Sequence, residues 1–585
     1  MTLSTAAKAS RAERLRPKTG QTIAVYWSDE HYLGDLVDIS RTGLQFTATS
    51  ARTLRPGTKT EAIMLDGNGS RLGCGTSVVA RVSENRLHEE GRSSVSLKFD
   101  TDQMHLLGAL SPSLHTPEYV TGELDPKALV GLTSMLDATD FTIDAFYKKS
   151  GPDILEKCKN FRPWVDDMML KELYQRFWRV TLTSALDHEI TVFDPIRRTE
   201  RPMICFDSNS YLGLHRDPRV IERTAQVLRA VGYGTPSAQM LGGTNRYLRE
   251  LEDDLSDFLG REDTIIFPTG FAANIGAVGA LVRKDDAVFR DRFAHASIQD
   301  ACRSSQARFN SIFAHNDMSS LSQLLEQAGA EGCQGKLIVT DGVFSMHGRI
   351  APLPDLAQLA KRHSARLMID DAHGVGVLGA NGRGIEEHWG QPGAADILMG
   401  TLSKALGAIG GYVSGSKDLI YYLRFYATSG MFTTSLPAAI CAGLREALQI
   451  IRNERHQRDQ LWANIRAFSP ALREAGFIVP DAVSPITTIF MGNHRLMLEF
   501  SRELFDAGIK CGNVMFPVVS KGEAILRFTL NARHTPQELQ YALDILIRLG
   551  TKWGVLHRSP EETFEIGRRI RHINPPRAPQ GLELG

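Results

Sequence analysis

The stretch DILMGTLSKALGAIGGYV, Asp396 to Val413, decides how the rest of the chain is interpreted. It begins with a short apolar run, Asp396 to Met399, that is typical of a buried strand, and continues through Thr401, Ser403 and Lys404 into glycines and alanines. Burial lowers the pKa of a lysine, so that its amine becomes a nucleophile able to form a Schiff base with an aldehyde. An isolated Ser-Lys pair after a strand is usually unremarkable, so this interpretation depends on partners elsewhere in the chain.

The composition indicates an ordinary globular protein of more than one domain, with 585 residues, 42% hydrophobic and 23% charged. The 67 basic and 67 acidic residues cancel, which argues against general attraction to nucleic acid or an anionic membrane. Seven cysteines are scattered without a CxxC pair, so we expect no metal site and a reducing compartment. Because no long apolar run is present, we expect a soluble cytoplasmic protein, with peripheral membrane contact as the alternative.

Short apolar runs alternate with helix-length stretches from about residue 200 onward, which predicts a mainly parallel sheet covered on both faces. The runs are DTIIF (263–267), AVFR (287–290), NSIFA (310–314), KLIVT (336–340), RLMID (366–370) and DILMG (396–400). Ligands of such sheets bind beyond the carboxyl ends of the strands. The polar residues at or after the ends of three of the runs are Asp341 with Ser345, Asp370 with His373, and Thr401 with Lys404. We therefore expect a site at this edge.

The rest of the chain divides by pattern into further units. Residues 1–108 alternate in the manner of a small β-barrel, and residues 109–175 predict a linker and helices. Residues 176–436 form the expected large domain and residues 437–556 a smaller α+β domain. Residues 557–585 are rich in proline and arginine and are expected to be a disordered tail.

The sequence DISRTG, Asp38 to Gly43, resembles the [D/N]-x-S-x-x-G pattern of PilZ domains, although the R-x-x-x-R spacing of that family is absent. The resemblance implies binding of cyclic di-GMP, whose phosphates and guanines suit the fork of arginine. The residues that it implies are Arg11, Arg14, Arg16, Asp38, Ser40 and Gly43. The alternative to nucleotide binding is that residues 1–108 form a domain that docks a partner or stabilises a dimer.

Residues 200 to 550 resemble the α-oxoamine synthases, a family of fold-type-I pyridoxal phosphate enzymes that includes 8-amino-7-oxononanoate synthase and serine palmitoyltransferase. The motifs occur in the family's order: SNSYLGL, PTGFAAN, DRFAHAS, TDGVFSM, DDAHGVG, TLSKALG, FTTSLP and LRFTL. The resemblance implies an α/β fold: a large domain with a mainly parallel sheet and a small α+β domain, preceded here by the PilZ-like barrel.

The same resemblance assigns the residues around the cofactor ring. Lys404 is similar to the Schiff-base lysine, which also moves the Cα proton, and Asp370 to the carboxylate that keeps the pyridine nitrogen protonated. Ala372 would lie beneath the ring, and His373 and Ser345 would hydrogen-bond its phenolic oxygen. The last residue of this set is His295, similar to the histidine that stacks on the ring and acts as an acid.

The resemblance likewise assigns the phosphate and substrate groups. Gly270 and Phe271 would offer backbone amides at a helix N-terminus, with the hydroxyl of Thr401 beside them. Two threonines from a second subunit, Thr433 and Thr434, would complete the phosphate site, which implies a homodimer with a shared active site. The carboxylate of the amino acid would be held by Asn209 and Arg527.

The implied reaction is a pyridoxal phosphate-dependent, decarboxylative Claisen-type condensation of an amino acid with an acyl thioester of CoA or a carrier protein. Its products are a 2-amino ketone, CO2 and the free thiol carrier. The helical extension before the large domain favours a long-chain, serine palmitoyltransferase-like activity of sphingolipid biosynthesis. The alternatives are 8-amino-7-oxononanoate synthase (biotin biosynthesis) and glycine C-acetyltransferase. The alternative from another functional class is a regulatory protein that responds to cyclic di-GMP.

Overall fold

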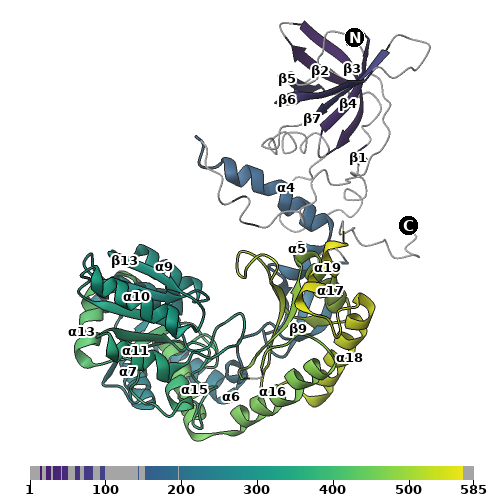
Figure 1. The fold of residues 1–585 in the computed structure, drawn as a ribbon. Coiled ribbons are helices and arrows are strands. Elements are labelled where there is room, and N and C mark those ends of the chain that lie inside the picture. Colours follow the sequence, from purple (N-terminus) through teal and green to yellow (C-terminus); the bar gives the residue numbers. More distant parts are fainter. Residues whose placement is uncertain are drawn as a thin grey trace.

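The computed structural model describes seven strands between residues 14 and 98, residues 143 and 146, and residues 152–194, 197–481 and 483–570 (Figure 1). Side chains are described only from residue 143 onward. No helix in these parts is long and apolar enough to cross a membrane.

A seven-stranded sheet forms the centre of the large domain, in the order β11-β17-β16-β15-β14-β12-β13. Its strands are β11 (Asp263–Phe267), β12 (Ala287–Asp291), β13 (Phe309–Phe313), β14 (Lys336–Asp341), β15 (Arg366–Asp370), β16 (Ile397–Thr401) and β17 (Gly411–Gly415). All neighbours pair in parallel except β17, which is antiparallel to β11 and β16. Every predicted apolar run forms one of these strands, so the expected mainly parallel sheet is confirmed.

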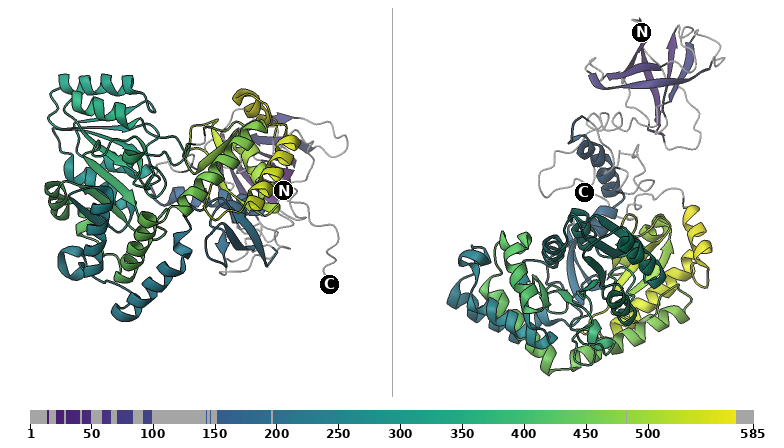
Figure 2. Two further views of the ribbon diagram at one scale, coloured as in Figure 1. Left: turned by 90° about the horizontal axis from the view of Figure 1, so that it is seen from below. Right: turned by 60° about the vertical axis from the view of Figure 1, so that its left-hand side comes forward.

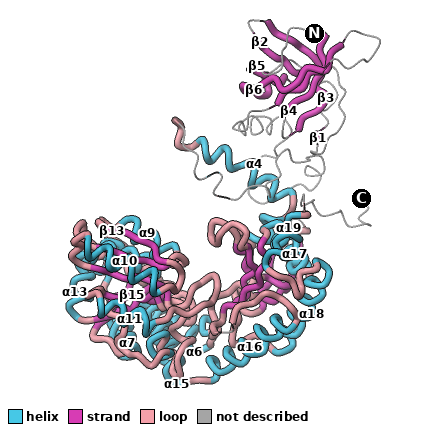
Figure 3. Tube along the Cα trace, viewed as in Figure 1, coloured by secondary structure: helices cyan, strands magenta, loops and turns pink. Residues whose placement is uncertain are grey.

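Both faces of this sheet are buried, as continuous apolar strands require. Adjacent residues of one strand belong to different core clusters: Ile338 packs on one face and Val339 on the other. Helices lie on both sides of the strands (Figures 1 and 3). They are α7 (Arg246–Leu259), α8 (Gly270–Leu281), α9 (Ala296–Ser304), α10 (Met318–Ala330), α11 (Leu353–Arg362) and α13 (Lys417–Tyr426).

The C-terminal part contains the expected smaller α+β unit, a three-stranded antiparallel sheet with helices (Figure 2). Its strands are β18 (Ile486–Gly492), β20 (Gly512–Val514) and β21 (Ala524–Thr529), and its helices α16 (His456–Glu474), α17 (His494–Asp506) and α18 (Pro536–Trp553). The preceding helix, α15 (Ala438–Asn453), packs instead on the large domain, where Gly443 faces Thr224 of α6 (Pro218–Val231).

A four-stranded sheet that the sequence did not predict joins residues 181–205 to the C-terminal part. It contains β8 (Thr181–Leu182), β9 (Glu189–Asp194), β10 (Thr199–Cys205) and β19 (Ile509–Lys510). β10 and β19 pair in parallel, with Ile204 opposite Ile509. Buried side chains of β9 and β10 form a separate cluster with Phe505 of α17.

The expected disordered tail over 557–585 is wrong for its first part. Helix α19 (Pro560–Arg568) begins with a capping box between Ser559 and Glu562 and has a proline in its first turn. Gly567 lies so close to Asn493 that a Cβ would meet that side chain at 2.1 Å, so the helix is packed against α17. Residues 571–585 lie outside the described residues.

The strands before residue 100 form an antiparallel sheet of their own, in the order β1-β3-β2-β5-β6-β7-β4, and an additional pairing of β3 with β4 closes it. The strands are β1 (Arg14–Leu15), β2 (Thr22–Trp27), β3 (Glu30–Ser40), β4 (Gly43–Thr49), β5 (Lys59–Leu65), β6 (Arg71–Ser83) and β7 (Arg92–Lys98). The PilZ-like identity stays a prediction. Arg11 and Arg16, like the helices expected between 109 and 142, lie outside the described residues.

Candidate active site

Lys404 lies in the loop after β16, at the edge where the parallel strands end. Its side chain is half-buried, and burial lowers the pKa of its amine to about 8, although the nearby carboxylates of Asp370 and Asp341 oppose that shift. Among the described residues, no hydrogen bond or ion pair holds this amine. A lysine with a lowered pKa and a free amine suits nucleophilic attack on an aldehyde.

Asp370 ends β15 and is 4% exposed. Both carboxylate oxygens are held: Oδ2 accepts from Asn274 Nδ2 at 2.7 Å, and Oδ1 accepts from the backbone amide of Ala372 at 3.1 Å. This carboxylate is therefore fixed in orientation and can present its remaining lone pairs to one cationic N–H. Ala372, two residues further on, is half-buried.

His295 caps the N-terminus of α9, where its backbone amide donates to Asp341 Oδ2 at 2.9 Å. Its ring remains accessible to solvent, yet desolvation by the surrounding protein lowers its pKa, and the charges of Asp370 and Lys404 act on the same ring. Burial raises the pKa of Asp341 well above its usual range, with Asp370 adding to the effect. The amine, the carboxylate and the imidazole thus lie within electrostatic reach of one another.

His373 is 4% exposed, and its Nδ1 lies 2.5 Å from the hydroxyl of Tyr211. Burial lowers the pKa of His373 well below its usual range, and the positive charges of Lys404 and Arg527 add to the effect. Tyr211 is fully buried, which raises the pKa of its hydroxyl. Because Tyr211 occupies Nδ1, the other nitrogen of His373 is left to meet a ligand.

Arg527, on β21, crosses from the small domain to this edge. Its Nε donates to the backbone oxygen of Ser345 at 2.7 Å, and its Nη2 donates to Asn209 Oδ1 at 3.0 Å. The two residues assigned to the carboxylate of the amino acid are therefore in contact. Among the described residues, no hydrogen bond engages the hydroxyl of Ser345, which is therefore available to a ligand.

The N-terminus of α8 provides a cradle for an anion. Thr269 caps it by accepting from the amide of Ala272 at 3.0 Å, and Gly270 packs so closely on β16 that a Cβ would lie 3.2 Å from Thr401 Oγ1. Thr401 Oγ1 also lies 2.8 Å from Ser403 Oγ. Backbone amides at a helix N-terminus beside two hydroxyls suit a phosphate.

None of these contacts at the described N-terminus of α8 involves Thr433 or Thr434. Thr434 is exposed and forms a bridge with Ala238, and the next residue, Ser435, donates its amide to Ser237 O at 3.0 Å. Their assigned role at the phosphate of a second subunit stays a prediction.

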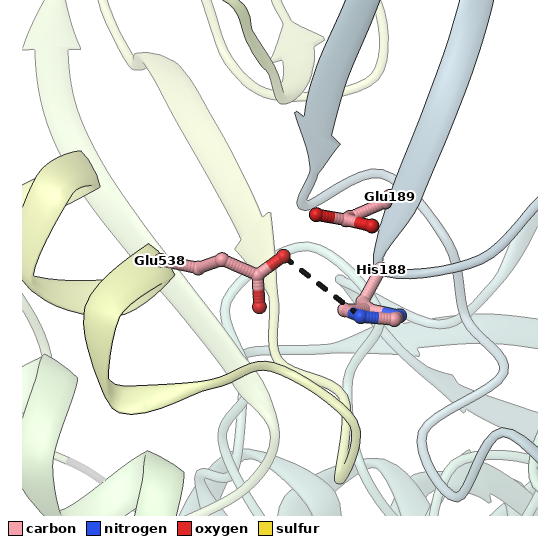
Figure 4. Close-up of side chains that lie close together, drawn as sticks. All are labelled: His188, Glu189 and Glu538. Carbon is pink, nitrogen blue, oxygen red and sulfur yellow. Dashed lines mark ion pairs between the residues drawn. The ribbon is translucent and has the colours of Figure 1, made fainter.

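One group of possible metal ligands is found in the described part of the chain: His188, Glu189 and Glu538 (Figure 4). Glu538 Oε2 accepts from the amide of Thr535 at 2.7 Å in the capping box of α18, and Oε1 lies 3.8 Å from His188 Nε2. A hydrogen bond to Asp187 raises the pKa of His188, which favours an ion pair. These contacts join the loop before β9 to α18, so we assign the three residues a structural role.

Sequence reasoning missed three residues of the site: Asn274, Ser297 and Tyr211. Each stands inside a motif quoted above, PTGFAAN, DRFAHAS or SNSYLGL, but only the packing of helices on the sheet reveals what it contacts. Ser297 Oγ lies within hydrogen-bonding distance of both Asn274 and His295.

Comparisons with known proteins agree with this geometry. The profile of the family "Aminotransferase class I and II" matches residues 201–546. The chain is 36% identical over 466 residues to 4-hydroxy-2,2'-bipyrrole-5-methanol synthase PigH of Serratia sp. (strain ATCC 39006), covering 80% of this chain and 68% of that protein. It is 39% identical over 344 residues to 8-amino-7-oxononanoate synthase 1 of Bacillus subtilis (strain 168), covering 59% of this chain and 87% of that protein.

Solved structures give the same result. A serine palmitoyltransferase from S. paucimobilis, with pyridoxal phosphate bound together with myriocin, aligns with a TM-score of 0.64 at 30% identity, over 69% of this chain and 100% of that one. An 8-amino-7-oxononanoate synthase from Francisella tularensis aligns with a TM-score of 0.53 at 28% identity, over 60% of this chain and 98% of that one.

Proposed function

Because the chain belongs to the aminotransferase class I and II family, and within it to the α-oxoamine synthases, we propose that it condenses an amino acid with an acyl thioester, using pyridoxal phosphate. Carbon dioxide and the free thiol carrier leave, and a 2-amino ketone remains. The observation that carries this proposal is the amine of Lys404, with its pKa lowered to about 8, beside Asp370 at the carboxyl edge of the sheet.

The residues fit the cofactor. Asp370, fixed by Asn274 and the amide of Ala372, offers a carboxylate to a protonated ring nitrogen. The capped N-terminus at Gly270 offers backbone amides to a phosphate. When bound there, pyridoxal phosphate supplies an electron sink for charge that develops at Cα.

The other residues position the substrate and move protons. Arg527, already in contact with Asn209, can hold the carboxylate of the amino acid through its remaining N–H groups. The amine of Lys404 takes the proton from Cα and later returns one. A bond then forms between Cα and the thioester carbonyl carbon, the thiolate leaves with a proton, and loss of CO2 breaks the bond between Cα and its carboxylate. His295 can donate a proton to the oxygen of the carbonyl under attack.

For the substrate, we favour a long-chain, serine palmitoyltransferase-like activity. The fit to the S. paucimobilis serine palmitoyltransferase, over its whole length, and the aromatic helix α4 (Glu156–Leu170) before the large domain support this choice. The identity of 38–39% to 8-amino-7-oxononanoate synthases supports the second candidate, transfer of a pimeloyl-type group to alanine. Acetyl transfer to glycine is the third.

The test supplies the holoenzyme with serine, alanine or glycine and with palmitoyl, pimeloyl or acetyl thioesters of CoA and of a carrier protein, and identifies products by mass spectrometry. We expect an amino ketone from serine and palmitoyl thioester. A product only from alanine or glycine would overturn the long-chain assignment, and no amino ketone from any pair would overturn the proposed reaction.

A regulatory role for the N-terminal strands is a separate proposal. Arg14 of β1 stands opposite Ser40 in the strand register, which brings the backbone of the arginine segment beside the DISRTG motif. Binding of cyclic di-GMP at micromolar concentration by the full chain, lost in Arg14→Ala, would support it. Failure to bind would leave this sheet as a docking or dimer-stabilising unit.

A further inference from the structure

Asn274 is a fully buried asparagine in the second turn of α8, pointing at the active site rather than at solvent. Its Nδ2 donates to Asp370 Oδ2 at 2.7 Å and to Ser297 Oγ at 2.8 Å, so both amide hydrogens are used. Its Oδ1 has no partner among the described residues. The opposite orientation of the amide would set an oxygen against the acceptor-only carboxylate, so the observed orientation is the one that the network allows.

Ser297 connects Asn274 to His295 through hydrogen bonds. Its hydroxyl oxygen accepts from Asn274, and the same hydroxyl lies 2.7 Å from His295 Nδ1, to which it can donate its hydrogen. The backbone amide of Ser297 donates to the same nitrogen at 3.2 Å. Two donors therefore converge on Nδ1 of His295.

Because the backbone amide can only donate, Nδ1 is the acceptor of that bond and does not carry the proton of a neutral imidazole. The hydroxyl of Ser297 then donates to the same nitrogen. The proton must then be on Nε2, the nitrogen on the side of the ring away from α9. Only this tautomer lets a neutral His295 donate a hydrogen bond from Nε2 to a substrate oxygen. Removing the hydroxyl would leave the backbone amide of Ser297 as the remaining donor to Nδ1, so the preference for this tautomer would weaken.

We propose that Asn274 and Ser297 are positioning residues that form a hydrogen-bond relay from Asp370 to His295 and hold His295 in its Nε2-protonated tautomer. The relay joins the carboxylate of Asp370, which would meet the ring nitrogen of the cofactor, to the imidazole of His295, so Asn274 contributes to the orientation of both side chains. The role of His295 as a donor to the substrate rests on the proposed function. The tautomer itself does not, because the protein alone makes these contacts.

The test uses the full-length holoenzyme labelled with ¹⁵N-histidine. The imidazole signals of His295 are assigned by their loss in His295→Gln, and ¹⁵N shifts distinguish a nitrogen that carries hydrogen from one that does not. We expect wild type to show an unprotonated Nδ1, and Ser297→Ala, which keeps the backbone amide but loses the hydroxyl, to show a measurable fraction of the Nδ1-protonated tautomer. We also expect Ser297→Ala to lower kcat roughly tenfold while each KM changes less than twofold, because a misplaced proton acts after substrate binding.

Two further variants separate this relay from general packing. Asn274→Leu keeps the approximate side-chain volume and should likewise raise the fraction of His295 that is protonated on Nδ1. If this variant fails to fold, Ser297→Ala alone tests the relay. Ser256→Ala is the matched control, because Ser256 is a buried serine with two hydrogen bonds, to Glu252 O and to Thr264, outside the relay. We expect its His295 signals and its kcat to match wild type.

A protonated Nδ1 in wild type, or unchanged His295 signals in Ser297→Ala, would overturn the relay. The enzyme could instead show the expected ¹⁵N signals of His295 but form no amino ketone from any substrate pair. That result would overturn the proposed reaction and leave the relay unaffected.

Discussion

The lowered pKa of Lys404 should be visible in the rate at which the cofactor-free enzyme takes up pyridoxal phosphate. Only the neutral amine attacks an aldehyde, and with a pKa of about 8 roughly a tenth of it is neutral at pH 7. The rate constant should therefore rise as pH increases through 8 and level off above about pH 9. Stopped-flow absorbance after mixing would measure it.

A lysine of ordinary pKa gives a different profile. Its rate constant would keep rising by about tenfold per pH unit through pH 9.5, because its amine remains mostly charged there. That result would contradict the burial of Lys404 described here.

Arg527 offers a second test at the level of single residues. Arg527→Lys removes the planar fork that reaches Ser345 O and Asn209 at once. Charge-assisted hydrogen bonds contribute about 1.5–3 kcal/mol each, so KM for the amino acid should rise by roughly 10- to 150-fold. Steady-state kinetics should show little change in KM for the thioester.

The matched control for this variant is Arg452→Lys. Arg452 pairs with Asp257 at 2.8 Å on the surface of the large domain, so its kinetics should match wild type. An equal effect of both changes, or a selective effect of Arg527→Lys on the thioester, would contradict the assignment of Arg527.

Among the elements, the loop between β14 and α11 joins the two domains. Met346 packs in a cluster with Val514, Val519 and Ile525 of the small domain. Gly348, at φ +67°, fits against the backbone oxygen of Ile486 so closely that a Cβ would lie 2.5 Å from it. The same loop contributes Ser345 to Arg527, so its seating on the small domain also sets the substrate site.

Gly348→Ala and Gly390→Ala separate steric contact from backbone strain. Gly390 has φ +63° but nothing within 4 Å of its Cβ position, so its substitution should cost only about 1 kcal/mol. Gly348→Ala should lower the unfolding midpoint by several degrees more and raise KM for the amino acid. Calorimetry and kinetics would measure both; equal losses in the two variants would contradict a close fit at Gly348.

The sequence predicted the central sheet well for a physical reason. Parallel strands buried on both faces are continuous apolar runs, and their carboxyl ends place the following polar residues, such as Asp370 and Lys404, at one edge. The parallel pairing of Ile204 with Ile509 lay beyond prediction, because the two residues are far apart in the chain. Helix α19 was missed although Ser559 and Glu562 carry its capping box, because the composition of the tail outweighed that local signal.

The residues of the site divide in the same way. Motifs identified Lys404, Asp370 and His295, which the structure brings within electrostatic reach of one another. The relay through Asn274 and Ser297 depends on how α8 and α9 pack on the sheet, and no spacing within the sequence encodes a contact between two helices.

For the whole molecule, we propose a homodimer that buries the surroundings of the phosphate cradle. Large apolar side chains are exposed there: Leu241 is 83%, Phe271 44% and Phe432 76% accessible. Such a patch marks an interaction surface. Because Thr433 and Thr434 follow Phe432 directly, a second copy seated on this surface would bring them to its partner's site.

Light scattering after size-exclusion chromatography would test this proposal. Wild type should elute at twice the chain mass of 64.7 kDa, and Phe432→Glu at the mass of one chain, with weaker retention of the cofactor. Ile312→Glu is the control, since Ile312 is equally an exposed apolar residue (53%) but lies on the edge strand β13. A monomeric wild type, or an unaltered Phe432→Glu dimer, would contradict this interface.

The central claim is that Lys404 is the residue that binds the cofactor covalently, and chemical trapping tests it most directly. Borohydride reduction of the holoenzyme fixes pyridoxal phosphate on whichever amine carries it, and peptide mapping by mass spectrometry then locates the label. We predict one labelled site, Lys404, and no label in Lys404→Ala. A label on another lysine, or none on wild type with stoichiometric cofactor, would contradict the account.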